Sequence, residues 1–397
     1  MMEQSVDRNV KAIIVKAKPA LAPRSRSKRH PGTPPSLPGS VGGSFSRPSS
    51  KASSRPASTV ALLARKLGLR LGDQSALTVR RLRHGNGYRF IRADGQPIRE
   101  RDLIARFHAL AVPPAYDEVR YALDPALHLQ AVGRDAAGRL QYRYHADWEQ
   151  VRETRKARRL ATLVEALPTI RRSTAQHLSG DTPTREFALA AVIELIARTA
   201  IRPGSESYAR LNGTRGATTL LKSNVAIEDD CIVLAFRAKG GKQVRKECGA
   251  ANLVRALGVL RQLPGRRMFQ YRMDNGEIRQ VTTTQVNMFL REIAGIRISL
   301  KDFRTLMASA AVMDSLSRVV PADSARARRK QVLEAVRAAA DELANTPAIC
   351  RKSYVHDTIV TAFEDGLLER FAATLKGCRS LARREQLLAR VVATAAG

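Results

Sequence analysis

The sequence predicts an α+β protein: a small strand-rich N-terminal domain followed by a larger, mainly α-helical domain. Short runs with alternating apolar residues, separated by glycine-containing turns, continue to about residue 147. After Trp148 the apolar residues recur at helical spacing, whereas residues 31–56 are rich in proline, glycine and serine. We therefore expect a disordered basic tail at residues 1–58, the strand-rich domain at 59–150, the helical domain at 151–397, and a linker near 148–157.

Two β-hairpins and one short helix make up the predicted N-terminal domain. His84-Gly-Asn-Gly87 separates two runs of strand composition, residues 77–83 and 88–92, and has the composition of a hairpin turn. A second strand pair is predicted on either side of the turn at Asp135-Ala-Ala-Gly138. A short helix is expected over residues 99–110, ended by the two prolines that follow it.

The clearest helix of the second domain is predicted at residues 185–201, where apolar residues supply a broad buried face. Thr182 is its expected N-cap, Pro183 its expected first residue, and Pro203-Gly204 its expected end.

A β-hairpin is expected to interrupt the helices of this domain. Residues 231–237 and 243–247 have strand composition, and the glycine-rich Ala238–Lys242 forms the turn between them. Helices resume after Asn252, and Ser324 is expected to cap a further one. The buried side of that helix is predicted to contain Val332, Val336, Ala340 and Leu343.

The charge of the chain favours a polyanionic partner. Its 68 lysines and arginines exceed its 36 acidic residues, which gives a net charge of +32 and a pI near 11.1. Nucleic acid is the first expectation and an anionic membrane the second, with a merely soluble basic protein as the plain alternative. The tail carries five lysines and six arginines against Glu3 and Asp7, a net +9, so +23 remains on the rest of the chain. The tail could grip DNA phosphates or be an inert extension.

Several kinds of chemistry find no support in the sequence. It contains no G-x-x-x-x-G-K-[ST] loop for ATP and no dense acidic cluster for Mg²⁺. Neither an apolar stretch long enough to span a bilayer nor a secretory signal at residues 1–18 is present. We therefore expect no cofactor, no metal and no membrane partner. Four cysteines without zinc spacing are expected to be reduced thiols in a cytosolic protein: Cys231, Cys248, Cys350 and Cys378.

Four side chains at the ends of predicted elements could carry phosphoryl chemistry. Arg202 and Arg304 could bracket a phosphate, because guanidinium groups hold their charge and match phosphate geometry. Lys239, at the tip of the predicted hairpin, could give up a proton, and the Tyr354 hydroxyl could attack phosphorus and form an ester. Taken singly, each is more often an ordinary surface or core residue.

The order of these residues carries more information than any one of them. The chain reads Ile201-Arg202-Pro-Gly, Phe236-Arg-Ala-Lys239-Gly-Gly-Lys, Lys301-Asp-Phe-Arg304-Thr, Asn345-Thr-Pro and Arg351-Lys-Ser-Tyr354. This series resembles the active site of the type IB DNA topoisomerases in their compact bacterial and poxviral form, and the resemblance extends from about Leu77 to the C-terminus. Pro113-Pro-Ala-Tyr, Leu263-Pro-Gly and Met268-Phe-Gln-Tyr271 also fit it.

The resemblance implies a fold of the tyrosine recombinase and type IB topoisomerase type, and a role for each residue. Tyr354 would become a 3′-phosphotyrosine, Arg202 and Arg304 would neutralise the non-bridging oxygens, and Lys239 would protonate the 5′-oxygen. Asn345 stands where poxviral and eukaryotic relatives have histidine, and its amide can still donate to a phosphoryl oxygen. The alternative for Asn345 is a helix cap before Thr346-Pro347.

The resemblance also implies a DNA-contacting surface and a set of departures. The residues that match the family's DNA-contacting positions are Arg139, Gln141, Tyr142, Tyr144 and Tyr208. For Tyr142 and Tyr144 the alternative is packing on one face of a strand. The sequence departs from the family's usual pattern at Gly213–Leu220, at Leu306 and at Tyr116, which concerns DNA affinity and rate more than the reaction.

Two rival interpretations remain. A tyrosine recombinase shares the Arg–Lys–Arg–Tyr chemistry, but recombinases generally carry histidine where this chain has Lys301. A catalytically idle DNA-architectural protein would need none of the four candidate residues. The expected partner is double-stranded DNA, and the resemblance implies a monomer in the cytoplasm, associated with the nucleoid.

Overall fold

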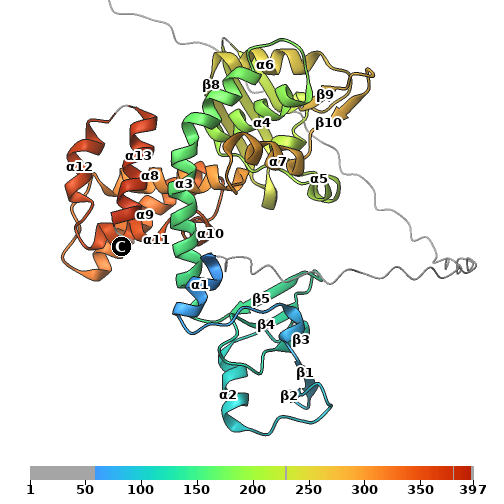
Figure 1. The fold of residues 1–397 in the computed structure, drawn as a ribbon, viewed down its shortest axis with the longest axis vertical. Helices are drawn as coiled ribbons and strands as arrows, with labels where there is room; N and C mark the ends of the chain where they lie inside the picture. Colours follow the sequence, from blue (N-terminus) through green and yellow to red (C-terminus); the bar gives the residue numbers. More distant parts are fainter. Residues whose placement is uncertain (1–58, 229, 379, 395–397) are drawn as a thin grey trace, which may run out of the picture. The chain divides into compact units, whose positions relative to one another are not determined.

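The computed structural model describes residues 59–397 apart from 229, 379 and 395–397. The predicted tail at residues 1–58 lies outside the described residues. Within the described part, a strand-rich N-terminal region precedes a larger and mostly helical domain, so the predicted α+β fold class is confirmed (Figure 1). No helix in this part of the chain has the length and apolar character needed to cross a bilayer.

The N-terminal domain is a five-stranded antiparallel sheet with the order β2-β1-β3-β4-β5. Its strands are β1 (Val79–His84), β2 (Gly87–Ile91), β3 (Asp117–Tyr121), β4 (Leu129–Arg134) and β5 (Leu140–Tyr144). His84 pairs with Gly87, as the predicted hairpin turn requires. The helix α2 (Arg101–Ala109) packs Phe107 against the rings of Phe90 and Tyr121, at centroid distances of 5.0 and 4.9 Å. These buried aromatic rings tie the helix to the sheet.

A single 30-residue helix, α3 (Trp148–His177), leads into the second domain (Figure 1). Its first turns bury Trp148 and Val151 in a small cluster with Ala64 of α1 (Thr59–Lys66). Further along, apolar residues from Ala157 onward join the main core. The predicted linker at residues 148–157 is therefore the first third of α3, and the chain passes into the helical domain without leaving helical geometry.

The helical domain is built around α4 (Arg185–Thr199), of whose 15 residues ten are buried. A helix that is apolar on every side needs neighbours on every side. Its neighbours include α6 (Ala251–Gln262), α7 (Thr283–Ala294) and α8 (Leu300–Leu316). The remaining helices are α5 (Glu206–Asn212), α9 (Ala325–Glu342), α10 (Pro347–Ser353), α11 (Asp357–Glu364), α12 (Glu369–Lys376) and α13 (Leu381–Thr394).

Two small sheets interrupt these helices. One has the antiparallel order β6-β7-β8 and consists of β6 (Val225–Glu228), β7 (Cys231–Arg237) and β8 (Gln243–Gly249). The other pairs β9 (Gln270–Arg272) with β10 (Ile278–Gln280). Short 3₁₀ turns are η1 (Gln74–Ala76), η2 (Ala217–Thr219), η3 (Lys222–Asn224) and η4 (Lys239–Gly241). The predicted hairpin at residues 231–247 is confirmed, with η4 as its turn.

The predicted start of α4 at Arg185 is confirmed, but its predicted N-cap and its predicted end were wrong. Thr184, not Thr182, is the N-cap, because its side-chain oxygen accepts from the Phe187 amide at 3.2 Å. Pro183 precedes the helix, and its carbonyl accepts a hydrogen bond from the Arg272 amide. The helix ends at Ala200 in left-handed geometry, before Pro203. The capping of α9 by Ser324 is confirmed by its hydrogen bond from the Ala327 amide.

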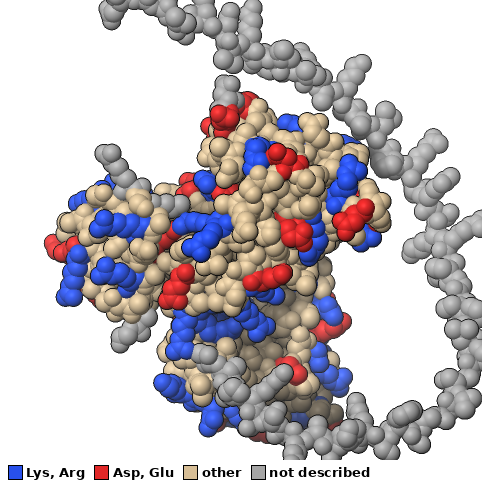
Figure 2. Space-filling model, turned by 45° about the horizontal axis from the view of Figure 1, so that its top comes forward, with Lys and Arg blue, Asp and Glu red and all other residues tan. Residues whose placement is uncertain are grey.

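Basic side chains are spread over the face of the chain in Figure 2, with fewer acidic ones among them. Much of the acidic charge is already paired, for example Asp302 with Arg159 and Glu385 with Arg171. The excess of arginine and lysine therefore remains available to an anionic partner.

Candidate active site

The five predicted catalytic residues come from four loops and one helix of the second domain. Arg202 follows α4, Lys239 lies in η4, and Arg304 lies near the start of α8. Asn345 occupies the connection from α9 to α10, and Tyr354 is the C-cap of α10. Residues separated by as many as 152 positions in the chain can therefore act together only if the helices pack as described.

Arg304 is the most deeply buried of these side chains, with 1% of its surface exposed. One terminal nitrogen donates to the Ala200 carbonyl and the other to the Leu343 carbonyl at 3.0 Å. Its Nε is buried and has no partner among the described residues. Burial lowers the pKa of Arg304, and interaction with Tyr354 opposes that change. A guanidinium has too high a pKa to lose its proton in a protein, so a fixed positive charge lies under Tyr354.

Arg202 and Asn345 form the second part of the site. The Arg202 guanidinium donates to the Asn345 side-chain oxygen and, at 3.5 Å, to the Ala344 carbonyl. This leaves the Asn345 Nδ2 amide buried, with no partner among the described residues. A buried donor without a partner is costly and commonly marks a functional position. The alternative that Asn345 caps a helix is wrong, because Thr346 accepts the Ile349 amide as the N-cap of α10.

Two alanines with left-handed backbone geometry lie beside these arginines. Ala200 and Ala344 each have a φ of 50°, a conformation that costs a residue with a Cβ atom about 1–2 kcal/mol. Both present their carbonyl oxygens to a candidate catalytic arginine, Ala200 to Arg304 and Ala344 to Arg202. The unfavourable backbone therefore occurs where the chain must turn to hold these guanidinium groups.

The Tyr354 ring lies beside two cations. Its centroid is 4.9 Å from the Arg304 guanidinium carbon and 5.6 Å from the Lys301 ammonium. The Tyr354 carbonyl accepts from the Ser309 hydroxyl at 3.1 Å, so α8 holds both the arginine and the backbone of the tyrosine. The phenol is thereby placed next to the positive charge that a phosphate would need.

Lys239 is not part of this buried cluster. It is exposed on the β7–β8 hairpin, where its ammonium lies 5.3 Å from the centroid of the Tyr208 ring. Two glycines with φ of 79° and 76°, Gly240 and Gly241, follow it. The turn of the hairpin is tied to the site by Lys242, which donates to the Asn345 carbonyl at 2.7 Å.

The segment that departs from the family pattern supports the Arg202 loop. A Cβ atom on Gly216 would lie 2.5 Å from the Arg202 carbonyl, so only glycine fits there. The Ala217 amide donates to that same carbonyl at 2.8 Å, and the Thr218 hydroxyl donates to Pro203 at 3.0 Å. Leu306 is buried in the main core of the helical domain. The unusual sequence therefore still provides the contacts that position the first arginine.

The predicted DNA-contacting residues of the small domain lie on and beside the edge strand β5. Tyr142 and Tyr144 are 39% and 41% exposed, and their rings stack at 6.2 Å. They share a face that is partly open to solvent, and on it the Tyr144 ring also stacks on Trp148 at 6.2 Å. Arg139 and Gln141 both donate to the Asp135 carboxylate, at 2.9 and 2.8 Å. Hydrogen bonding from Arg139 is the main reason that the pKa of Asp135 is lowered to about 2.

Three residues that build the site were not predicted as site residues. Lys301 beside the Tyr354 ring could have been found from its position one turn before Arg304. Lys242 could have been found in the Lys-Gly-Gly-Lys turn. The bond from Ser309 to the Tyr354 carbonyl has no sequence signal, because it depends on how α8 packs against α10.

The four cysteines are free thiols. Burial raises the pKa of Cys350 and Cys248, so a smaller fraction of each thiol is ionised at neutral pH. In the part of the chain that the structure describes, no three histidine, cysteine or acidic side chains gather as a metal site would need.

Two cations beside a tyrosine ring suit phosphoryl chemistry, and comparison with known proteins identifies the class of enzyme. The family model "Eukaryotic DNA topoisomerase I, catalytic core" matches residues 145–378, which span all five predicted catalytic residues. The model "Bacterial DNA topoisomerase IB, N-terminal domain" matches residues 87–135 of the sheet domain. The chain belongs to the type IB DNA topoisomerases, and it is a type I DNA topoisomerase that acts on DNA.

One viral relative supports the same assignment. The chain is 28% identical over 269 residues to the DNA topoisomerase 1B of Acanthamoeba polyphaga mimivirus, which covers 66% of this chain and 80% of the relative. The resemblance that the sequence motifs indicated is thereby confirmed at the level of the family.

Proposed function

We propose that this topoisomerase relaxes supercoiled duplex DNA through a 3′-phosphotyrosine at Tyr354, without ATP or a metal ion. The observation that carries the proposal is the position of the Tyr354 ring, 4.9 Å from the buried Arg304 guanidinium. Arg202 is hydrogen-bonded to Asn345, whose Nδ2 is buried and has no partner among the described residues. A scissile phosphate seated there would face a nucleophile on one side and charge-stabilising donors on the other.

In the proposed cleavage step the Tyr354 oxygen attacks phosphorus and the bond from phosphorus to the 5′-oxygen breaks. The phenolic proton passes to water, and Lys239 gives a proton to the leaving 5′-oxygen. One phosphodiester replaces another, so the bond energy is retained and ATP is not needed. The free 5′-hydroxyl end can rotate, and its return attack on the phosphotyrosine reseals the strand.

Fixed cations would stabilise the transition state in this scheme. Arg202 and Arg304 would neutralise the non-bridging oxygens, and the Asn345 amide would donate the further hydrogen bond. Both guanidiniums are already held by backbone carbonyls, so little reorganisation would accompany the reaction. Side chains would thus supply the positive charge that Mg²⁺ supplies in metal-dependent nucleases.

The small domain is proposed to act as the second half of a DNA clamp. We assign residues 59–150 to this half and 151–397 to the catalytic half. Tyr142, Tyr144 and Tyr208 are exposed aromatics that could reach sugars or base edges, and Arg139 could exchange Asp135 for a phosphate. We further propose that the enzyme works as a monomer associated with the nucleoid.

A tyrosine recombinase is the nearest alternative chemistry, and Lys301 argues against it at the position where recombinases generally carry histidine. The two activities have different products. A recombinase would join strands from two duplexes, whereas a topoisomerase changes only the linking number of one.

The proposal is tested by incubating the protein and its Tyr354→Phe variant with negatively supercoiled plasmid in EDTA, without ATP. We expect a ladder of relaxed topoisomers from the wild type and none from the variant. Relaxation that needs Mg²⁺ or ATP, or that survives Tyr354→Phe, would contradict the proposal. Binding without relaxation by either protein would favour a DNA-architectural role.

A further inference from the structure

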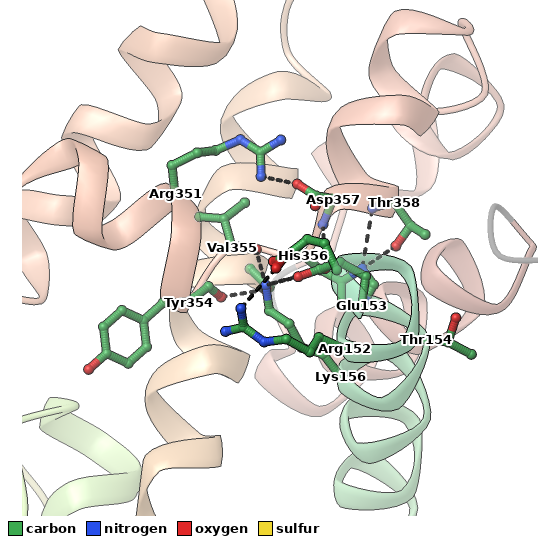
Figure 3. Close-up of polar contacts among 12 residues, drawn as sticks. Arg152, Glu153, Thr154, Lys156, Arg351, Tyr354, Val355, His356, Asp357 and Thr358 are labelled. Atoms are coloured by element: carbon green, nitrogen blue, oxygen red, sulfur yellow. Dashed lines mark hydrogen bonds and ion pairs between the residues drawn. The ribbon is translucent and has the colours of Figure 1, made fainter. Parts of the chain in front are cut away.

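A polar cluster behind the nucleophile joins α3 to the turn that follows Tyr354 (Figure 3). Lys156 of α3 donates from Nζ to the Val355 carbonyl at 2.5 Å. Glu153, one helical turn earlier, accepts the Asp357 amide at 3.4 Å. The two α3 side chains therefore hold both a carbonyl and an amide of the segment just after the tyrosine, while the Tyr354 ring points away from them.

The two side chains are also paired with each other and largely removed from water. Their closest nitrogen–oxygen distance is 3.3 Å, and the side chains of Lys156 and Glu153 are 17% and 18% exposed. Burial lowers the pKa of Lys156 and raises that of Glu153, and each partner opposes the change in the other. Because a buried ion pair gains little net stability over apolar residues, stability alone is a weak reason for its presence.

The surroundings leave the turn little freedom. His356 lies between Val355 and Asp357 and is fully buried. As the N-cap of α11, its side chain accepts a hydrogen bond from the Thr358 amide. Burial, and then the nearby Lys156 charge, lowers the pKa of His356 to about 4, so the ring is neutral at pH 7. Arg351 pairs with Asp357 across the same turn. The backbone on the C-terminal side of the tyrosine is therefore fixed by side chains from α3, α10 and α11.

We propose that Glu153 and Lys156 are positioning residues for the Tyr354 nucleophile. The inference rests on the proposed role of Tyr354. Ser309 of α8 holds the Tyr354 carbonyl, and Lys156 of α3 holds the next carbonyl along the chain. With both peptide groups fixed, the phenol keeps its place over Arg304. Loss of the Lys156 bond lets Val355 shift, and misplacement of a reacting group by about 1 Å can cost about 10²-fold in rate.

The experiment compares Lys156→Met, Lys156→Arg and Glu153→Gln with the wild type. Methionine keeps an unbranched stem but removes the donor, whereas arginine restores a charged donor. Arg158→Met is the matched control, because Arg158 is an exposed cation on the same helix. The readouts are the single-turnover rate of covalent protein–DNA adduct formation at saturating protein, the Kd for the same duplex, and the Tm.

We expect Lys156→Met to form the adduct about 10- to 100-fold more slowly at saturation. Its Kd should stay within about threefold of wild type, Lys156→Arg should recover most of the rate, and Arg158→Met should match wild type at saturation. Glu153→Gln should be slowed severalfold. If Lys156→Met does not fold, the saturated rate of Glu153→Gln decides the question.

Wild-type saturated rates in Lys156→Met or, failing that, in Glu153→Gln would overturn the inference. So would a weakened Kd with an unchanged saturated rate, since that result would make Lys156 a DNA contact. Tyr354→Phe is run alongside. Failure of the wild type itself to form an adduct would instead remove the proposed function, and the two failures are thus distinguishable.

Discussion

The buried half of the active site and its exposed half are built in opposite ways. Arg304 is 1% exposed and donates to two backbone carbonyls, and Asn345 is 3% exposed and bonded to Arg202. Lys239 lies on an exposed hairpin, and among the described residues its charged group contacts only the face of an aromatic ring. Arg304 and Asn345, two of the groups proposed to stabilise charge, are buried in the core, whereas Lys239, the group proposed to move a proton, is exposed.

This difference suggests that the same side chains serve both folding and catalysis in the buried half of the site, but not in the exposed half. A core residue that contacts several helices cannot be changed without disturbing their packing. A surface lysine on a glycine-rich turn can be changed with little effect on packing. Substitutions should therefore separate the two halves by whether they alter rate alone or rate and stability together.

The largest effect is expected for Arg304→Ala. Loss of an arginine that stabilises phosphoryl-transfer charge costs about 10³–10⁵-fold in rate in other enzymes. The substitution also leaves the Ala200 and Leu343 carbonyls without partners, at roughly 1–3 kcal/mol for each unsatisfied buried group. The rate of single-turnover cleavage and the Tm should both fall. The exposed Arg337→Ala control should change neither. An unchanged Tm would show that Arg304 does not stabilise the fold, which would contradict its contrast with Lys239.

Lys239→Ala should lower the cleavage rate by about 10²–10⁴-fold, the range typical of a lost general acid. Because Lys239 is exposed, the Tm should stay at the wild-type value. A duplex with sulfur in place of the scissile 5′-oxygen should restore most of the rate, since a thiolate leaves without a proton. A variant that stays slow on the sulfur substrate would remove Lys239 from the acid role.

Asn345→Asp tests the unpartnered amide of the buried half. The substitution keeps the oxygen that accepts from Arg202 but replaces the Nδ2 donor with a second acceptor. Loss of one such donor is expected to cost about 10²–10³-fold in cleavage rate, and Asn345→Ala should be less damaging because it adds no negative charge. Equal rates for Asn345→Asp and wild type, measured in single turnover, would refute a donor role.

Acid should destabilise the turn after Tyr354 through His356. Its pKa is lowered to about 4 in the folded protein, below the ordinary value of about 6.5, so the unfolded chain binds the proton first. The stability from the neutral ring is therefore complete above pH 6.5 and is lost as the pH falls toward 4. The loss is on the order of 1–3 kcal/mol, at about 1.4 kcal/mol for each pH unit. Denaturant unfolding of His356→Asn, which retains a capping side chain, should depend less on pH than wild type does; an equal dependence would refute this role.

The smallest effect is expected at Ala200, whose φ is 50°. Ala200→Gly should raise the free energy of unfolding by up to about 1 kcal/mol, because glycine adopts this geometry without a Cβ clash. Ala188→Gly, within the regular part of α4, should lower it by about 0.5–1 kcal/mol. Urea unfolding measures both variants, and a destabilised Ala200→Gly would show that the backbone there is not strained.

The sequence singled out the candidate catalytic residues, but it did not predict the contacts that hold them. Arg202, Lys239, Arg304, Asn345 and Tyr354 stand in short motifs with recognisable order. The bonds from Ser309 and Lys156 to the tyrosine segment join residues 45 and 199 positions apart. Such contacts depend on helix packing, and no local pattern encodes them.

The elements of the fold likewise divide into those that local sequence predicts and those that depend on tertiary packing. The hairpins at His84–Gly87 and Ala238–Lys242 followed from turn composition. The continuous helix α3 did not, because its first turns are dense in charge and resemble a polar linker. Tertiary packing of Trp148, Val151 and Leu160 fixes it as helix. The N-cap of α4 was misplaced by two residues because Thr182 and Thr184 offer the same side-chain chemistry.

The most direct test of the account uses a nicked-product assay on a single duplex. The cut strand is labelled at its 5′ end in one sample and at its 3′ end in another, and the reaction is stopped with detergent in EDTA. Attack by Tyr354 on the 3′ side predicts that the 5′-labelled fragment stays attached to the protein, on a peptide containing Tyr354. The 3′-labelled fragment should leave with a free 5′-hydroxyl. Attachment of the 3′-labelled fragment, or an adduct on any other residue, would contradict it.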